Sequence, residues 1–234
     1  MSDSIQIERL VAKGGMGAVY RGTRAGESIA VKVPLKRFRD DHTVRQQFVQ
    51  EAQALARVPH PNIVRLVCAG DSAVGPFVAT EWLEGESLVE LIANETPLPL
   101  LSIYNLFSQL LSAVEFSHSR GVVHADIKPE NIMILRRAPY RERLVLFDFG
   151  VSSVDDRRPG EDLYVYGTPF YLAPEALHGG SGTVVAEIYA LGTLLWEMVS
   201  GLGAALVTER EIAGDSNRRV ASATAGPVGL NEAA

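Results

Sequence analysis

Two short polar motifs constrain this chain more than any other feature. The first is the run His124–Asn131 (His-Ala-Asp-Ile-Lys-Pro-Glu-Asn), and the second is Asp148-Phe149-Gly150. The first motif lies between two apolar runs, Val122-Val123 and Ile132–Ile134, and this pattern predicts a loop between two short strands. Such a loop can aim a carboxylate, an ammonium group and an amide at one point, which indicates a catalytic or ligand-binding site.

The composition is that of an ordinary globular protein. The chain has 234 residues, of which 47% are hydrophobic and 21% are charged. Its net charge of −6 provides no basic field, so neither nucleic acid nor anionic lipid is an expected partner. The single cysteine, Cys68, cannot form an internal disulfide, and its apolar neighbours indicate a small core residue. With no cationic and apolar leader over Met1–Leu10, these features predict a cytoplasmic protein.

The first ninety residues are predicted to form strands and one helix. Ser28–Val33 alternates with a period of two, which places Ala30 and Lys32 on one face of a strand and the apolar residues on the other. The segment Asp41–Val58 has helical spacing, and Glu51 falls within its apolar stripe. A carboxylate on a buried face is costly unless it is paired. We therefore expect an ion pair between Lys32 and Glu51.

Helical patterns dominate from Thr96 onward, with helices predicted over Leu100–Ser119 and Val184–Ser200. The second of these extends into a mostly apolar run of membrane-spanning length, Ile188–Val207. Glu197 in its middle, several glycines and the lack of a neighbouring basic cluster argue against insertion into a bilayer. A helix in the core of the protein explains the same pattern, and we prefer it.

Together these motifs resemble the eukaryotic-like serine/threonine protein kinases, including their bacterial members. The resemblance also includes a glycine loop, Gly14-Gly15-Met16-Gly17, and the triplet Ala173-Pro174-Glu175. It implies an α+β, two-lobed kinase-like fold with a small β-rich lobe containing one helix. It covers residues 5–200, divided into a small lobe at about 5–80, a hinge at 81–86 and an incomplete helical lobe at 87–200.

The resemblance also implies roles for individual residues in phosphoryl transfer from ATP to a Ser or Thr hydroxyl of a protein substrate. The expected catalytic residues are Asp126, Lys128, Lys32 and Glu51. Mg²⁺ would be held by Asn131 and Asp148. The nucleotide would contact Val11, Gly14, Gly15, Gly17, Val19, Ala30, Lys32, Thr80, Glu81 and Leu83. At Gly14 and Gly17 the backbone would approach the phosphates closely, where φ can need to be positive. His124 would pack in the core.

Three departures from the family pattern affect regulation and stability. Ala12 replaces the first glycine of the phosphate loop, and Ala125 replaces the arginine that usually binds a phosphorylated activation segment. We therefore expect Thr168, in Gly167-Thr168-Pro169, to position substrate rather than to carry an activating phosphate. Glu187 stands where the family usually has Asp, which predicts a side chain one methylene too long for its position.

Residues 201–234 are rich in Ala and Gly and have no aromatic side chain, so they are predicted to form a disordered tail. The chain resembles a kinase domain without its last helices, which would leave an apolar surface open to self-association. Three hypotheses therefore stand: an active serine/threonine kinase, a nucleotide-binding pseudokinase or scaffold, and an inactive truncated remnant.

Overall fold

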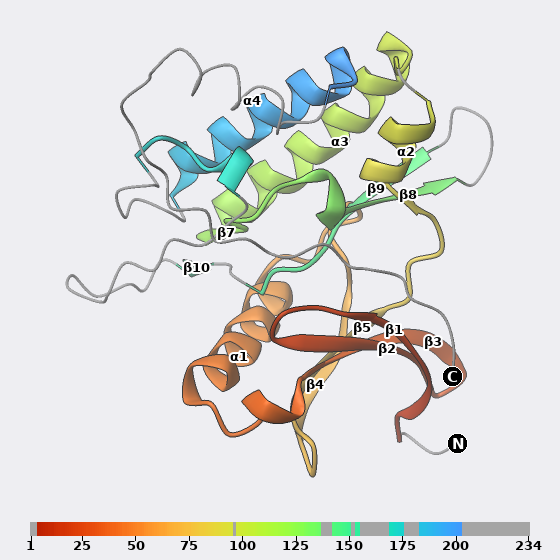
Figure 1. The fold of residues 1–234 in the computed structure, drawn as a ribbon, viewed down its shortest axis with the longest axis vertical. Helices are drawn as coiled ribbons and strands as arrows, with labels where there is room; N and C mark the ends of the chain where they lie inside the picture. Colours follow the sequence, from red (N-terminus) through yellow and green to blue (C-terminus); the bar gives the residue numbers. More distant parts are fainter. Residues whose placement is uncertain are drawn as a thin grey trace, which may run out of the picture.

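The small lobe is one antiparallel sheet with a helix packed beside it (Figure 1). The computed structural model describes residues 4–95, 97–136, 142–150, 153–154, 169–175 and 183–202. The five strands have the spatial order β1-β2-β3-β5-β4. Along the chain the lobe contains β1 (Gln6–Lys13), β2 (Gly17–Arg24), β3 (Glu27–Pro34), the 3-10 turn η1 (Lys36–Phe38), α1 (His42–Arg57), β4 (Leu66–Ser72) and β5 (Gly75–Glu81).

The larger lobe holds the remaining helices and three short pairs of strands (Figure 1). Strand β6 pairs with β8, β8 pairs with β9, and β7 pairs with β10. Its elements are β6 (Glu86–Ser87), α2 (Leu88–Asn94), α3 (Leu100–Ser119), β7 (Val122–Val123), η2 (Pro129–Asn131), β8 (Ile132–Arg136), β9 (Glu142–Leu146), β10 (Ser153–Val154), η3 (Pro169–Tyr171) and α4 (Val184–Ser200). The α+β, two-lobed architecture predicted from the sequence is therefore confirmed.

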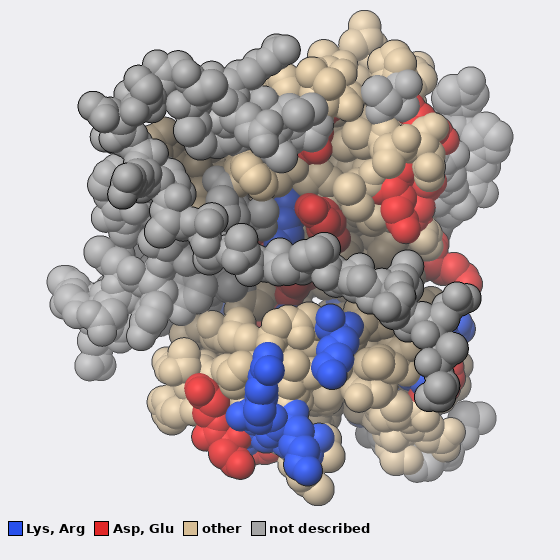
Figure 2. All heavy atoms as spheres, viewed as in Figure 1, with Lys and Arg blue, Asp and Glu red and all other residues tan. Residues whose placement is uncertain are grey.

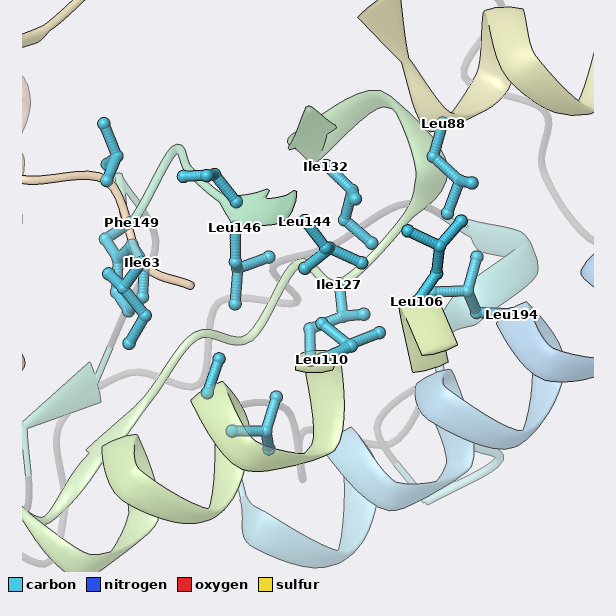
Figure 3. Packing of buried hydrophobic residues seen from close by; sticks show 14 of the residues in the cluster. Ile63, Leu88, Leu106, Leu110, Ile127, Ile132, Leu144, Leu146, Phe149 and Leu194 are labelled. Atoms are coloured by element: carbon cyan, nitrogen blue, oxygen red, sulfur yellow. The ribbon is translucent and has the colours of Figure 1, made fainter. Parts of the chain in front are cut away.

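The core of the large lobe lies between the β8–β9 hairpin and helices α3 and α4 (Figure 3). Leu144 and Leu146 on β9 point toward Leu106 and Leu110 on α3, and all four side chains are fully buried. Leu194 extends the same cluster to α4. This packing holds β8 and β9 in place, and these strands flank the two polar motifs.

The predicted helices agree closely with the structure, with one omission. Helices α3 and α4 have the bounds expected from the sequence. Glu51 lies on the buried face of α1 as predicted, together with Val44, Phe48 and Leu55, whereas Ala52 of the same apolar stripe is only partly buried. The helical part of the chain begins at Leu88, however, and not near Thr96. A capping box starts α2, in which Ser87 and Glu90 bond each other's backbone N–H groups.

Helix α4 is buried on one face and exposed on the other. Ala190, Leu194 and Met198 are buried, whereas Val185 is 67% exposed and Ile188 is 58% exposed. The prediction of a core helix therefore holds for one face only. The helix ends at Ser200 because Gly201 adopts the left-handed conformation (φ 66°) and its N–H caps the carbonyl of Glu197 at 2.8 Å. Within the described ranges, no helix combines the length and the apolar content needed to cross a membrane.

Candidate active site

A cleft between the two lobes contains a cavity of about 460 Å³. Strands β1 to β3 form its roof, the segment after β5 forms its back, and β8 and the residues after β9 form its floor. Most residues predicted to bind a nucleotide or act on it line this cavity. They are Val11, Val19, Ala30, Lys32, Glu51, Thr80, Glu81, Leu83 and Asp148.

Lys32 pairs with two carboxylates, one from each lobe. Its Nζ lies 2.9 Å from Glu51 Oε2 on α1 and 2.5 Å from Asp148 Oδ1 after β9. The predicted Lys32–Glu51 ion pair is therefore present. A Cβ at Gly150 would lie 2.8 Å from this same Nζ, 3.2 Å from Asp148 Oδ1 and 3.3 Å from Glu51 Oε2, so a larger residue there would have to displace these paired side chains.

The three charges shift one another's pKa values in different directions. Burial alone would lower the pKa of Lys32, but Glu51 and Asp148 outweigh it and raise that pKa above its ordinary value. Burial raises the pKa of Glu51 despite the opposing charge of Lys32. Burial acts in the same direction on Asp148, but there Lys32 prevails and the pKa is lowered. The neighbouring charges explain the difference, because the carboxylate of Asp148 further raises the pKa of Glu51, whereas Lys128 adds to the lowering of the pKa of Asp148.

The catalytic-loop candidates meet at one point, as predicted. Lys128 Nζ lies 2.7 Å from Asp126 Oδ2. The amide Nδ2 of Asn131 donates to the main-chain oxygen of Asp126 at 2.8 Å and to its Oδ2 at 3.0 Å. Asn131 is 5% exposed, so these hydrogen bonds are shielded from water and fix the orientation of the Asp126 side chain.

Buried groups behind the loop hold its backbone. His124 is 1% exposed, packs edge-on against Phe149 with ring centroids 4.5 Å apart, and bonds the carbonyl of Phe147 through Nε2. Its predicted packing position is thus confirmed. Ala125 has a φ of 67°, which is costly for a residue with a side chain. The Ala125 N–H donates to Oε1 of Glu187 at 2.9 Å, and this bond helps to hold the strained residue.

Glu187 occupies its site without the misfit predicted from its length. It lies in the first turn of α4 and is 3% exposed. One carboxylate oxygen receives the Ala125 N–H, and the other contacts His118 Nε2 on α3. The longer side chain therefore joins α3, α4 and the catalytic loop, because its two oxygens reach partners on different segments.

The glycine loop differs from expectation in its backbone. Gly14, Gly15 and Gly17 do not have positive φ values, and none of them lines the cavity. The turn is instead closed by a hydrogen bond from the Gly14 N–H to the Gly17 carbonyl at 2.8 Å. In this conformation the loop connects β1 and β2 without a left-handed residue at any of these three glycines.

The hinge segment is tied to the sheet of the small lobe. The N–H of Glu81 donates to the carbonyl of Arg65 at 2.9 Å, and the N–H of Trp82 donates to Ser28 at 3.2 Å. The Glu81 N–H is thus already used within the sheet. An adenine contact at Glu81 would therefore involve its carbonyl, with the main chain of Leu83 beside it.

Some predictions lie outside the described residues. These are the substrate-positioning role of Thr168 and, beyond Leu202, the disorder of the tail predicted for residues 201–234. At the described end of the same segment, the Tyr171 hydroxyl donates to the buried carboxylate of Glu197 on α4. Burial and this hydrogen bond raise the pKa of Tyr171, so the phenol stays protonated.

The cavity also has walls that sequence reasoning missed. They are Ala12, Val64, Val78, Ser87, Glu90, Glu130, Met133 and Phe147. One signal could have located Met133. In the run Ile132–Ile134 the two isoleucines are fully buried, so a strand with period two must turn Met133 toward the opposite face.

Comparison with known proteins assigns the family. The protein kinase domain model matches residues 5–220, so the chain belongs to the protein kinase family. It is 32% identical over 205 residues to the serine/threonine-protein kinase pkn3 of Myxococcus xanthus, covering 84% of this chain and 38% of that protein. It is 31% identical over 204 residues to the serine/threonine-protein kinase PrkC of Bacillus subtilis, covering 86% and 31%.

A third relative is the serine/threonine-protein kinase PknB of Mycobacterium leprae, which is 29% identical over 209 residues, covering 86% of this chain and 33% of the relative. The chain thus spans about a third of the length of the curated relatives it matches. Membership in this family implies ATP, a protein substrate and a divalent metal ion.

Proposed function

We propose that this chain is a serine/threonine protein kinase that transfers the γ-phosphoryl group of ATP to a Ser or Thr hydroxyl with Mg²⁺ as the metal. One observation supports the proposal most strongly, which is the arrangement of charged side chains at the cleft. Lys32 contacts both Glu51 and Asp148 at one wall of the cleft, and Asp126 pairs with Lys128 in the catalytic loop. Phosphoryl transfer depends mainly on positioning and on electrostatic stabilisation, and this arrangement supplies both.

Each charged group has a task that follows from its surroundings. Lys32 stays protonated because its pKa is raised, so it would hold phosphate oxygens with a permanent charge. Asp126 would orient the substrate hydroxyl and accept its proton as the oxygen attacks the γ-phosphorus. Lys128, within 2.7 Å of Asp126, would offset the charge on the transferred group. The bond from the phosphorus to the oxygen of ADP breaks as the new bond forms.

The donor set fits a magnesium ion. Asn131 uses its Nδ2 for Asp126, which leaves its amide oxygen as a ligand, and Asp148 is ionised because its pKa is lowered. Hard oxygen ligands of this kind suit Mg²⁺, which usually binds through one or two protein groups together with substrate phosphates. When bound, the ion would neutralise phosphate charge.

Serine and threonine are the proposed acceptors for two reasons. The run Asp126-Ile127-Lys128-Pro129 resembles the loop of serine/threonine kinases, whereas tyrosine kinases usually carry Ala and Arg after the same Asp. The relatives named above are also serine/threonine kinases. ATP and the unpaired Cys68 are both compatible with the cytoplasm, which we propose as the location.

We further propose self-association through the large lobe. The exposed face of α4 carries Val184, Val185, Ile188 and Val199, and a second copy of the chain could cover this apolar surface. Light scattering should then show a molar mass that rises with protein concentration in the wild type. The variant Ile188→Glu should remain at the monomer mass, and a wild-type mass independent of concentration would refute self-association.

The function is tested by incubating the protein with ATP labelled at the γ position, Mg²⁺ and peptides that differ only in the acceptor residue. We expect label on Ser and Thr peptides, little on Tyr peptides, and a loss of about a hundredfold or more with Asp126→Asn. Label transfer that survives Asp126→Asn would refute the role of Asp126. A wild type that binds ATP but labels no peptide would favour a nucleotide-binding scaffold.

A further inference from the structure

Arg21 on β2 lies on the cleft side of the roof, toward the hinge. The register of the sheet places Arg21 opposite Ala30, and Ala30 opposite Thr80. Residues that lie directly opposite each other in antiparallel strands share one face of the sheet. Ala30 and Thr80 both line the nucleotide cavity, so the side chain of Arg21 projects from the face of the sheet that covers the nucleotide.

The guanidinium of Arg21 joins three segments of the chain. Its Cζ lies over the ring of Trp82 in the hinge, 5.1 Å from the ring centre. Its Nη2 donates to Ser28 Oγ on β3 at 3.5 Å, and its Nε lies 3.4 Å from Glu8 Oε2 on β1. The contacts from β1 and β3 hold the guanidinium over the indole, and the Arg21 side chain is only 31% exposed.

Trp82 is the residue at which the hinge is fixed to the roof. Its N–H donates to the carbonyl of Ser28 at 3.2 Å, and its ring is covered by Arg21, so the small lobe holds both its backbone and its side chain. Trp82 lines the cavity together with Glu81 and Leu83. A shift of the hinge at Trp82 would displace both neighbours, because the chain joins them directly, and theirs are the main-chain groups expected to meet the adenine.

The position of Arg21 along β2 indicates the base end of the nucleotide. The phosphate loop leads into β2 at Gly17, and Arg21 lies four residues further along the strand, a distance of about 13 Å in extended chain. Lys32, the residue proposed to hold the phosphates, lies opposite Val19, which is closer to that loop. Arg21 is therefore placed to influence the adenine end of the cleft and not the phosphates.

The charges around the hinge also favour a cation here. Residues 81–119 contain six Glu and no Lys or Arg. Figure 2 shows acidic side chains gathered over α2, where Figure 1 labels that helix, whereas the basic side chains in view lie mostly on the small lobe. The acidic segment that follows the hinge attracts a cation from the roof, and it contains no lysine or arginine that could replace Arg21 over the indole.

We propose that Arg21 is a positioning residue for the nucleotide, which holds the hinge main chain at the adenine position by stacking on Trp82. The inference rests on the proposed binding of ATP in the cleft. Arg21 acts through Trp82 and contacts no reacting group. When the stack is lost, the hinge leaves its binding-competent conformation for part of the time, and the apparent affinity falls in proportion to the competent fraction.

The test measures the affinity of the full chain for two probes, Mg-ADP and adenosine, of which adenosine has the base but no phosphate. Arg21→Met should weaken both about two- to fivefold, the range expected for a cation over an aromatic ring at a partly exposed site. The KM for ATP should rise by the same factor with little change in kcat. Arg9→Met, an exposed cation opposite Arg21 on β1, should bind both probes as the wild type does. A loss with Mg-ADP alone would overturn the proposal, because Arg21 would then act on the phosphates.

A double-mutant cycle separates the stack from a general loss of stability. Trp82→Leu keeps an apolar side chain but removes the ring, so adding Arg21→Met to it should not weaken binding further. Wild-type affinity in Arg21→Met, or an equal loss from Arg21→Met with and without the ring, would overturn the inference and leave the proposed function standing. A wild type that binds neither probe would overturn the proposed function and the inference with it.

Discussion

The floor and the roof of the nucleotide cleft are built in different ways. On the floor, His124, Ile127, Asn131 and Phe149 are all at most 5% exposed. On the roof, every residue of β1 is exposed, and its apolar residues Ile7, Leu10 and Val11 are 42% exposed or more. The catalytic loop and Asp148 thus stand on a buried framework, whereas β1, the outer strand of the roof, relies on solvent-accessible contacts. Strand β3, which carries Lys32, is anchored by the buried Ile29 and Val31.

This difference has a consequence for local stability. Hydrogen bonds shielded from water persist longer than exposed ones, so segments with few buried contacts open more readily. The floor should keep its geometry in the free protein, and the roof should adapt when a nucleotide binds. Four predictions, made on three variants, test this comparison and are taken from the largest expected effect to the smallest.

Lys32→Met should have the largest effect, because this lysine is the one contact shared by roof, α1 and floor among the described ion pairs. We expect phosphoryl transfer to fall about a hundredfold or more, which is a loss of about 2.7 kcal/mol of transition-state stabilisation. Initial rates at saturating ATP measure it. Arg9→Met, an exposed cation on β1, should keep the wild-type rate. More than about a tenth of the wild-type rate in Lys32→Met would contradict the assignment.

Glu187→Ala should loosen the floor. It removes the acceptor of the Ala125 N–H and the partner of His118, both beside a residue with positive φ. Leaving these groups unpaired should lower the free energy of unfolding by about 2 to 3 kcal/mol and reduce kcat more than the KM for ATP. Urea unfolding and steady-state kinetics measure the two effects. Glu8→Ala, an exposed glutamate on β1, is the control, and an equal response in both variants would refute the anchoring role.

The stability of Lys32→Met should depend on pH through Glu51. Burial already raises the pKa of this carboxyl, and removing Lys32 raises it further. When the pKa of a carboxyl is higher in the folded state than in the unfolded state, its ionised form destabilises the fold. This loss of unfolding free energy disappears as the pH falls toward the pKa of the unfolded state, because the carboxyl becomes protonated. The deficit in unfolding free energy relative to wild type should therefore narrow between pH 8 and pH 5.

Urea unfolding at several pH values checks this prediction. The double variant Lys32→Met, Glu51→Gln is the control, because it has no carboxyl to titrate at that position and should show no such narrowing relative to wild type. A single-variant deficit that widens toward low pH would mean that Glu51 is not the group responsible.

Arg37→Ala should have the smallest effect, and it concerns the roof. Its guanidinium donates to the Gly15 carbonyl at 3.1 Å from an exposed position. An exposed hydrogen bond of this kind contributes about 0.5 to 1 kcal/mol, so the KM for ATP should rise about two- to fivefold with little change in kcat. A change in kcat as large as that of Glu187→Ala would remove the distinction between roof and floor.

Local patterns in the sequence predicted much of this molecule. The helical spacing around Glu51 predicted both α1 and the ion pair, because a carboxylate within a buried apolar stripe is costly unless a cation lies beside it. The loop from His124 to Asn131 was predicted from the apolar runs beside it, and both runs form strands. The apolar residues of α4 predicted its bounds, and in the structure the helix ends where Gly201 caps it.

Other features depend on contacts between distant residues and could not be read locally. The fit of Glu187 depends on where α3 and the catalytic loop lie relative to α4, which no spacing in the sequence reveals. The start of α2 is different, because a local signal for it exists: the spacing of Ser87 and Glu90 is that of a capping box, and the sequence-based prediction missed it.

The contrast between roof and floor is tested most directly by amide hydrogen exchange with and without Mg-ADP. We predict fast exchange over Gln6–Gly17 in the free protein, with marked slowing when the nucleotide binds. We predict slow exchange over Ile127–Ile134 and Val145–Phe149 in both states. Fast exchange on the floor that slows with nucleotide, together with a roof that does not respond, would contradict the account.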